Sequence, residues 1–171
     1  MQKNTFNELG VNSNIVRALS EFGITEPTDI QEKAIPIINS GKDIIGKSKT
    51  GSGKTAAFGI PLINKVVPKK GVQALILAPT RELAVQISRE LGKFGKYSKL
   101  GIATVYGGVS LRPQIKDIAR SEIVVSTPGR LLDHLQQRNI DLSKITHFVL
   151  DEADRLVDMG FIRDIERMLS Y

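Results

Sequence analysis

The sequence predicts an α/β fold in which an open, mainly parallel β-sheet carries helices on both faces. Short apolar segments alternate with helix-favouring segments from residue 43 onward, which is typical of parallel strands joined by crossover helices. The apolar segments contain few polar residues, as expected for strands buried on both faces. A glycine-rich loop between the first strand and the next helix fits the same fold. The predicted strands are 43–47, 73–78, 101–106, 122–125 and 146–150.

Length and composition indicate one soluble globular domain. The chain has 171 residues, of which 41% are hydrophobic and 25% charged, and it contains no Cys, which excludes disulfides and Cys-based metal sites. The N-terminus lacks an apolar signal core, and no segment is apolar enough to cross a membrane. We therefore expect no membrane association and a cytoplasmic location, or a nuclear one in a eukaryote.

The chain is basic, with a net charge of +6 and a pI near 9.6. This charge is compatible with a polyanionic partner, although solubility alone is the alternative explanation. Only 5% of the residues are aromatic and none is Trp, which disfavours a binding mode built on many base-stacking rings.

Two helices are expected before the first strand. Residues 1–10 resemble an extended lead-in with an exposed aromatic side chain, Phe6. A helix capped at residue 12 or 13 is expected to end before Gly23. A second helix is capped by Thr28, with Gln31 three residues later as the partner in a capping box, and ends before Gly41.

The segment 48–55 joins the first predicted strand to a helix expected over 54–66, which is the layout of a phosphate-binding P-loop. It departs from the usual pattern because Ser48 replaces the first glycine. Gly51 and Gly53 permit a tight turn whose N–H groups face an anion, and the helix start adds its dipole. Lys54 can reach terminal phosphates, and the Thr55 hydroxyl can ligate Mg²⁺. A glycine-rich turn with a chance lysine is the alternative. The predicted binding residues are Thr50, Gly51, Ser52, Gly53, Lys54 and Thr55.

An acidic segment, 151–154, follows the last predicted strand. Acidic residues at the carboxyl end of a parallel strand face the ligand crevice of an open sheet. Beside a P-loop, Asp151 is the expected partner of Mg²⁺ through water, and Glu152 is placed to orient and deprotonate the attacking water. The alternative is an acidic first turn that complements the dipole of the next helix, expected over 153–170.

Residues 151–154 read Asp-Glu-Ala-Asp, the signature of the DEAD-box RNA helicases, and the chain resembles their first RecA-like domain from Phe6 to its end. Residues 23–31 resemble the Q motif of that family, which implies that Gln31 reads adenine. A Gln amide can donate to N7 of adenine and accept from its amino group, and this role is compatible with the capping box. The resemblance also implies an adenine contact by the Thr25 backbone and packing of Phe6 on adenine. A tail anchor is the alternative for Phe6.

Three further stretches resemble the RNA-facing motifs of the family. Two of them open helices, expected over 81–96 and 128–138, and one precedes a helix expected over 111–120. Helix N-termini, glycine backbone and Arg side chains all suit phosphates, so the implied partner is RNA held by its sugar–phosphate backbone with little sequence preference. Ordinary capping and turn chemistry is the alternative. The residues are Pro79, Thr80, Arg81, Gly107, Gly108, Thr127, Pro128, Gly129 and Arg130.

The resemblance implies the ATP- and Mg²⁺-binding half of an RNA-stimulated ATPase that locally unwinds RNA. In it, Lys54 stabilises charge, and Asp151 and Glu152 serve the metal and the water. A DNA helicase or translocase is one alternative. A nucleotide-dependent RNA clamp without catalysis is another, and little or no turnover is expected from these residues alone.

The family also has a second RecA-like domain and a Ser-Ala-Thr motif, and residues 1–171 contain neither. We therefore expect a first domain that is incomplete at its C-terminus. The resemblance implies a vacant strand position between 43–47 and the strand ending at Leu150, or one filled by another chain. Asp154, which couples to the Ser-Ala-Thr motif in the family, would then lack its partner.

Overall fold

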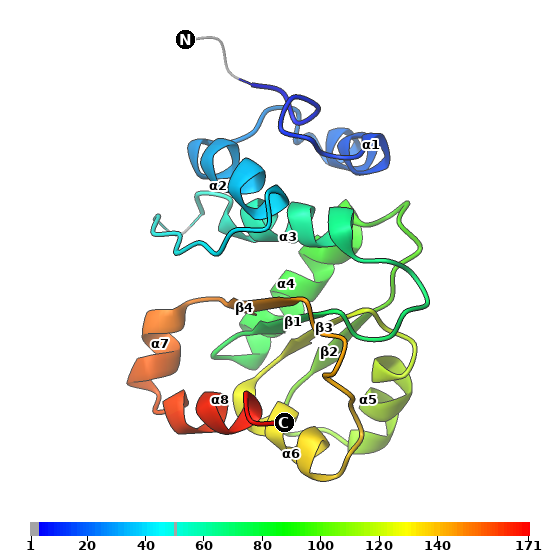
Figure 1. The fold of residues 1–171 in the computed structure, drawn as a ribbon, viewed down its shortest axis with the longest axis vertical. Helices are drawn as coiled ribbons and strands as arrows, with labels where there is room; N and C mark the ends of the chain where they lie inside the picture. The colour runs from blue at the N-terminus through cyan, green and yellow to red at the C-terminus, as the bar shows by residue number, and fades with distance from the viewer. Residues whose placement is uncertain (1–3, 50) are drawn as a thin grey trace. The chain divides into compact units, whose positions relative to one another are not determined.

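The computed structural model describes residues 4–49 and 51–171, which form two compact units (Figure 1). The helical unit contains the described residues up to Lys65 together with Arg89–Lys99. The sheet unit contains Val66–Ser88 and Leu100–Tyr171. No helix of the described residues has the length and apolar character needed to cross a membrane.

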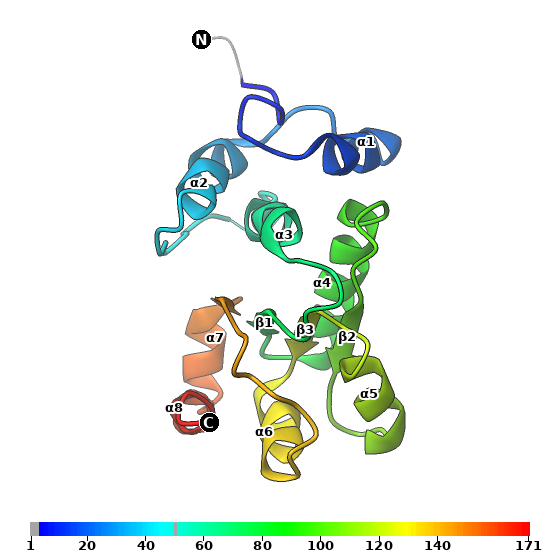
Figure 2. The same cartoon turned by 45° about the vertical axis from the view of Figure 1, so that its right-hand side comes forward.

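The helical unit is built from α1 (Ser13–Glu21), α2 (Asp29–Asn39), α3 (Lys54–Lys65) and the second half of α4 (Arg81–Phe94). The predicted cap of α1 is confirmed, since the Asn12 side chain accepts from the N–H of Asn14 at 2.9 Å. Gly23 follows α1 with a φ of +74°, a conformation that favours glycine. Helices α2 and α3 pack side by side (Figure 2).

The strand predicted at 43–47 is wrong. These residues form no regular structure, and the side chains of Ile44 and Ile45 are 39% and 100% exposed. A strand exists only where a neighbour satisfies its backbone N–H and C=O groups. Among the described residues no segment pairs with 43–47, so its apolar character alone does not make it a strand.

The exposed position expected for Phe6 is also wrong, because its side chain is only 2% exposed. The Phe6 carbonyl accepts the N–H of Val11 at 3.1 Å, which folds residues 6–11 into a compact turn. Burial of the ring removes apolar surface from water and ties the lead-in down. This placement favours the tail anchor over an adenine-facing ring.

The sheet unit contains four parallel strands in the order β2-β3-β1-β4: β1 (Ala74–Leu77), β2 (Ile102–Val105), β3 (Ile123–Ser126) and β4 (His147–Leu150). These confirm four of the five predicted strands. The helices that lie wholly in this unit are α5 (Leu111–Ile118), α6 (Pro128–Gln136), α7 (Ala153–Asp158) and α8 (Ile162–Met168). The single helix expected over 153–170 is thus two helices, because Gly160 between them has a φ of +81°.

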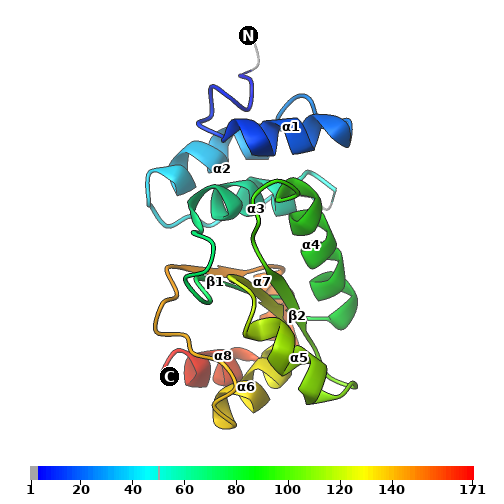
Figure 3. The same ribbon diagram turned by 90° about the vertical axis from the view of Figure 1, so that its right-hand side faces the viewer.

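One face of the sheet packs on α5, α6, α7 and α8, and these helices lie on the same side of it (Figure 3). Alternate strand residues point to this face, as the two-residue period of a strand requires. The core there contains Leu75, Leu77, Ala103, Val105, Val124, Leu131, Leu135, Leu156, Ile165 and Met168. The intervening side chains of Ile76, Ile123 and Val125 are also completely buried. Burial on both faces explains why the sequences of β1 and β3 are almost entirely apolar.

Strand β4 is an edge of this sheet. It pairs with β1, and within the described ranges no strand pairs with its other side. Its Phe148 and Leu150 side chains are 37% and 39% exposed, unlike those of β1 and β3. Direct pairing of 43–47 with β4, which would contradict the expected vacancy, does not occur. The vacancy itself remains a prediction.

Candidate functional site

The described residues of the segment 48–55, which are 48, 49 and 51–55, lead into the start of α3. Gly51 and Gly53 have φ values of +77° and +90°, the left-handed region that glycine enters without strain. Helix α3 begins at Lys54, and Thr55 is its partly buried second residue. The glycine turn and the helix start that the sequence predicts here are therefore present. Thr50, which we also expect to bind nucleotide, lies outside the described residues.

The Lys54 ammonium is held by its own loop. Its Nζ donates to the carbonyls of Ser48 at 2.8 Å and Lys49 at 3.0 Å. The Ser48 hydroxyl lies 2.7 Å from that of Ser52, which shows how a serine is accommodated where the pattern has glycine. An ammonium group carries three donors, so a phosphate that enters the loop can replace these carbonyls as the acceptor.

Gln31 and Thr28 of the α2 start hold the P-loop backbone. The Gln31 side chain accepts the N–H of Thr28 at 3.0 Å, which confirms the capping box, and its Nε2 donates to the carbonyl of Gly53 at 3.1 Å. The Thr28 hydroxyl donates to the carbonyl of Ser52 at 2.9 Å. A Cβ at Gly53 would lie 2.3 Å from Gln31 Nε2. Residue 53 must therefore be glycine for this contact to form.

The predicted adenine contacts can be placed relative to this network. Gln31 is 3% exposed, and two of the four hydrogen bonds that its amide can form are already made within the chain. One N–H and one oxygen lone pair remain, which is the pair that bidentate adenine recognition requires. Thr25 is exposed just before α2.

The acidic segment surrounds the start of α7 in the sheet unit. Asp151 continues the β1–β4 ladder, because its N–H donates to the carbonyl of Leu77 at 2.9 Å. Its Oδ1 accepts the N–H of Glu152 at 3.1 Å. Asp154 accepts the N–H of Arg155 at 3.0 Å with its own side chain. Asp151 and Glu152 are partly buried and Asp154 is exposed.

Glu152 combines an unusual backbone with an ion pair. It precedes α7 with a φ of +48°, in the left-handed region that non-glycine residues rarely adopt. Its carboxylate accepts from the Arg155 guanidinium at 2.7 Å. A general base must be free to accept a proton from water, so Arg155 would have to release or share this carboxylate.

The stretches predicted to face RNA follow three neighbouring parallel strands, β2, β3 and β1, and therefore lie together at the carboxyl ends of these strands. This end of the sheet, not its outermost strand β4, is the edge meant below. Pro79 is buried, Thr80 is partly buried, and Arg81 is exposed at the start of α4. The Thr80 hydroxyl accepts the N–H of Leu83 at 3.3 Å, so it also caps that helix. Gly107 and Gly108 are exposed after β2, and Gly108 has a φ of +81°.

The third stretch begins α6. Thr127 is its N-cap residue and Pro128 its first helical residue, as predicted. Gly129 is exposed, and Arg130 donates to the carbonyl of Val109 at 2.9 Å while its Nε lies 3.5 Å from an oxygen of Asp133. The structure therefore brings one glycine pair, two arginines and two helix starts to one edge.

Sequence reasoning missed three residues that support this edge. The Tyr106 ring lies under the Arg81 guanidinium at 4.4 Å, and the Gln114 amide donates to the Tyr106 carbonyl at 2.9 Å. His134 Nε2 lies 3.0 Å from Gln114 Oε1. A polar residue on the inward face of a helix is the signal that could have identified Gln114 and His134.

His134 is completely buried. Burial lowers its pKa below the ordinary value of 6.5; the nearby Arg130 acts in the same direction, and Asp133 opposes it. The Gln114 amide donates to a carbonyl, so its oxygen is the acceptor for His134 and the ring carries its proton on Nε2.

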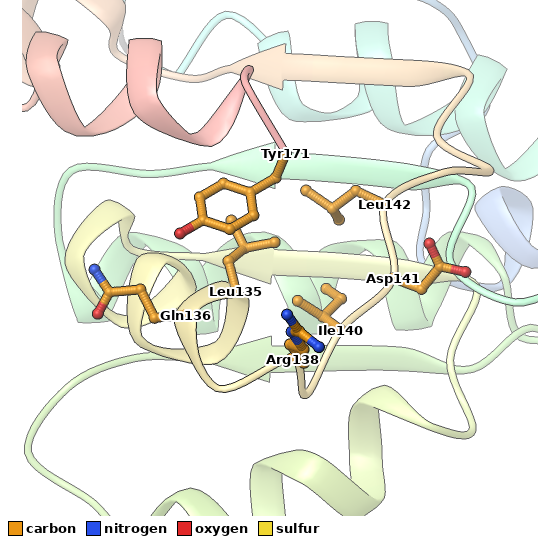
Figure 4. Close-up of a pocket in the computed structure, with 7 residues that line it drawn as sticks. All are labelled: Leu135, Gln136, Arg138, Ile140, Asp141, Leu142 and Tyr171. Atoms are coloured by element: carbon orange, nitrogen blue, oxygen red, sulfur yellow. The ribbon is translucent and has the colours of Figure 1, made fainter.

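A pocket elsewhere in the sheet unit does not contain the predicted chemistry (Figure 4). It lies between the end of α6, the segment that follows it, and the last residue of the chain. None of the predicted site residues lines it. Its lining residues are Leu135, Gln136, Arg138, Ile140, Asp141, Leu142 and Tyr171.

Comparisons with known proteins agree with this geometry. The family model described as DEAD/DEAH box helicase matches residues 28–171. A curated protein of Methanocaldococcus jannaschii, named as a probable ATP-dependent RNA helicase, is 46% identical over 166 residues, which cover 96% of this chain and 45% of that protein.

Two solved structures are also similar. A DEAD box protein from the hyperthermophile Methanococcus jannaschii has a TM-score of 0.94 and 44% identity, with 99% of this chain and 47% of that chain covered. A hypothetical ATP-dependent RNA helicase from Sulfolobus tokodaii has a TM-score of 0.85 and 41% identity, with 93% and 46% covered. This chain thus spans slightly less than half the length of these relatives. With an α/β, RecA-like parallel sheet and the residues Asp-Glu-Ala-Asp at 151–154, it belongs to the DEAD/DEAH box helicase family.

Proposed function

We propose that this chain is the ATP- and RNA-binding half of an ATP-dependent RNA helicase. The observation that carries the proposal is the hydrogen bond from Gln31 to the carbonyl of Gly53, because it joins a base-reading amide to a phosphate-binding loop. A bare P-loop would bind any nucleoside triphosphate. An amide fixed against that loop, with adenine-compatible groups remaining, favours ATP.

The residues around the nucleotide site each have a defined task in this proposal. The N–H groups at the start of α3 and the Lys54 ammonium bind the phosphates, and Thr25 and Gln31 bind the adenine. Packing of Phe6 on the adenine remains part of the proposal, and its ring, which is 2% exposed, would have to be uncovered for that contact. Thr50 joins the loop residues that line the phosphates.

We propose that Mg²⁺ is held by Thr55 and, through water, by Asp151. Within residues 4–49 and 51–171, no group of three or more His, Asp or Glu side chains could hold a metal ion. Mg²⁺ in nucleotide sites needs only one or two protein ligands, because phosphates and water supply the rest, so these residues fit it. When bound, Mg²⁺ neutralises charge that develops on the phosphates. Glu152 orients water and takes its proton, and Asp154 couples the site to a neighbouring segment.

RNA is proposed to bind along the edge formed by 79–81, 107–108 and 127–130. Its contacts there are N–H groups, glycine backbone and two guanidinium groups, which recognise phosphates and ignore bases. This composition predicts binding with little sequence preference and with a strong dependence on salt. A second RecA-like domain is proposed to complete both the RNA track and the catalytic site, and a further strand to pair with the open side of β4.

Nucleotide binding can be tested on this chain. We expect Lys54→Ala to weaken binding of a fluorescent ATP analogue about 10- to 100-fold, since a charge-assisted hydrogen bond to phosphate is lost. Lys42→Ala, which removes an exposed lysine of the same unit outside the loop, is the matched control and should bind as wild type does. Equal binding by both variants would exclude a phosphate role for Lys54.

Catalysis can be tested in the protein joined to its second domain. RNA should stimulate ATP hydrolysis and DNA should not, and Glu152→Gln should abolish turnover while leaving ATP binding intact. Turnover near the wild-type rate in that variant would show that Glu152 is not the base. Stimulation by DNA would favour the translocase alternative. Nucleotide binding without turnover in the joined protein would favour an RNA clamp.

A further inference from the structure

Tyr106 lies between two of the stretches assigned to RNA, and the proposed function gives it no task. We propose that Tyr106 is a positioning residue for the RNA-backbone site: its ring orients the Arg81 guanidinium, and its carbonyl fixes the segment 107–110. The inference rests on the proposed binding of RNA at this edge. Every residue that carries it belongs to the sheet unit.

The ring contact spans the sheet edge. Arg81 follows β1 and Tyr106 follows β2, and β3 lies between these two strands. Strands separated by one neighbour are roughly 9.5 Å apart, yet the Cζ of Arg81 lies 4.4 Å from the centroid of the Tyr106 ring. The contact therefore joins the first and second RNA-facing stretches.

The type of contact leaves Arg81 competent to bind an anion. A guanidinium has five N–H donors, all in its plane. A carboxylate partner would occupy some of these donors, whereas an aromatic ring contacts only the face of the group. Tyr106 can thus restrict the directions that Arg81 adopts without taking the hydrogen bonds that a phosphate needs.

The backbone of Tyr106 is restrained by hydrogen bonds from the helices packed on the sheet. Its carbonyl accepts from Gln114 of α5 at 2.9 Å, and Gln114 Oε1 in turn lies 3.0 Å from His134 Nε2 of α6. Gln114 is 5% exposed and His134 is completely buried, so this chain of hydrogen bonds is anchored in the core.

The other end of the glycine segment is also held, since Arg130 donates to the carbonyl of Val109 at 2.9 Å. Gly107 and Gly108 are exposed between these two restrained carbonyls. Their backbone is therefore presented to solvent at a fixed place rather than on a free loop. Tyr106 connects this presentation to the orientation of Arg81.

The test compares variants that separate the ring from the carbonyl. Tyr106→Phe keeps both, and Tyr106→Leu removes only the ring. Binding of a fluorescein-labelled single-stranded poly(U) oligonucleotide at low salt is measured by anisotropy. We expect Tyr106→Leu to bind about two- to fivefold more weakly, the range expected for an exposed cation–π contact, and Tyr106→Phe to bind as wild type does.

A double-mutant cycle with Arg81→Ala distinguishes positioning from a general effect. If Tyr106 acts through Arg81, Tyr106→Leu has no further effect on RNA binding once Arg81 is alanine. Additive losses, or a Tyr106→Leu variant that binds as tightly as wild type, would overturn the proposal. Thermal unfolding of each variant confirms that the fold persists.

A second measurement does not depend on RNA. The heteronuclear NOE of the Arg81 Nε–Hε group should indicate a restricted side chain in wild type and in Tyr106→Phe. In Tyr106→Leu it should indicate a side chain that moves freely on the picosecond-to-nanosecond timescale. Equal mobility in all three would overturn the positioning role even if RNA binds. If the wild-type chain binds no RNA while the NOE pattern is as expected, the RNA function of this edge fails and the orientation of Arg81 by Tyr106 stands.

Discussion

Replacing Gln31 by alanine is expected to release the P-loop backbone from α2. Two hydrogen bonds are lost: the one donated by the Thr28 N–H at 3.0 Å and the one donated to the Gly53 carbonyl at 3.1 Å. Because Gln31 is only 3% exposed, water does not replace the side chain freely. At a net 0.5–1.5 kcal/mol for each bond, the free energy of unfolding should fall by about 1–3 kcal/mol.

A second substitution tests the donor alone. Gln31→Glu keeps an oxygen for the Thr28 N–H but places the other carboxylate oxygen against the carbonyl oxygen of Gly53. Two acceptors then face each other in a buried position, so we expect a larger loss of stability than for alanine. Gln136→Ala, on the exposed side of α6, is the control and should change stability by less than about 0.5 kcal/mol.

Urea unfolding of this chain, followed by circular dichroism, measures the stability change, and competition between ATP and GTP measures adenine selectivity. If the same amide reads the base, as we propose, both Gln31 variants should lose the preference for ATP. A Gln31→Glu variant as stable as wild type would refute the donor assignment at Gly53. Loss of stability with an unchanged preference for ATP would keep the network and remove the adenine role.

Two further predictions concern the sheet unit. The pKa of His134 is lowered in the folded state, so the unfolded state binds more protons once the pH is below the ordinary pKa of 6.5. The free energy of unfolding should therefore fall as the pH falls below 6.5, by up to about 1.4 kcal/mol per pH unit. His134→Gln should remove this slope and His147→Gln, on an edge strand, should retain it; a slope unchanged in both would contradict the burial argument. Glu122→Ala should destabilise the chain by about 2–6 kcal/mol in urea unfolding, because the buried carboxylate accepts the N–H groups of Lys69 and Gly101, both at 2.7 Å. A change below about 1 kcal/mol would show that those N–H groups find other partners.

Local signals predicted most of this fold. The four strands of the sheet were found because their residues are mostly apolar. The starts of α1, α2 and α6 were found because Asn12, Thr28 and Thr127 are good N-cap residues. The P-loop turn was found because it depends on the glycines at 51 and 53. Such features depend on a few neighbouring residues, so the sequence suffices to identify them.

Features that depend on distant partners were not predicted. Residues 43–47 have the composition of a strand, but strand formation needs a neighbour that composition does not specify. The 2% exposure of Phe6 depends on tertiary packing that the composition of residues 1–10 does not specify. Tyr106 is separated by 25 positions from the Arg81 that it contacts, and no periodicity in the chain links the two. Turns, helix caps and buried strands were therefore predictable, whereas contacts between residues far apart in the sequence were not.

The left-handed backbone of Glu152 places stability and activity in opposition. A glutamate in that region is disfavoured by roughly 1–2 kcal/mol relative to ordinary backbone, whereas glycine enters it freely. Selection for stability alone would accept glycine or asparagine at this position. If the carboxylate serves the reaction as we propose, a library screened for thermal resistance should enrich those two residues, and a library screened for helicase activity should retain glutamate. The position thus allows selection for folding and selection for catalysis to be separated at a single codon.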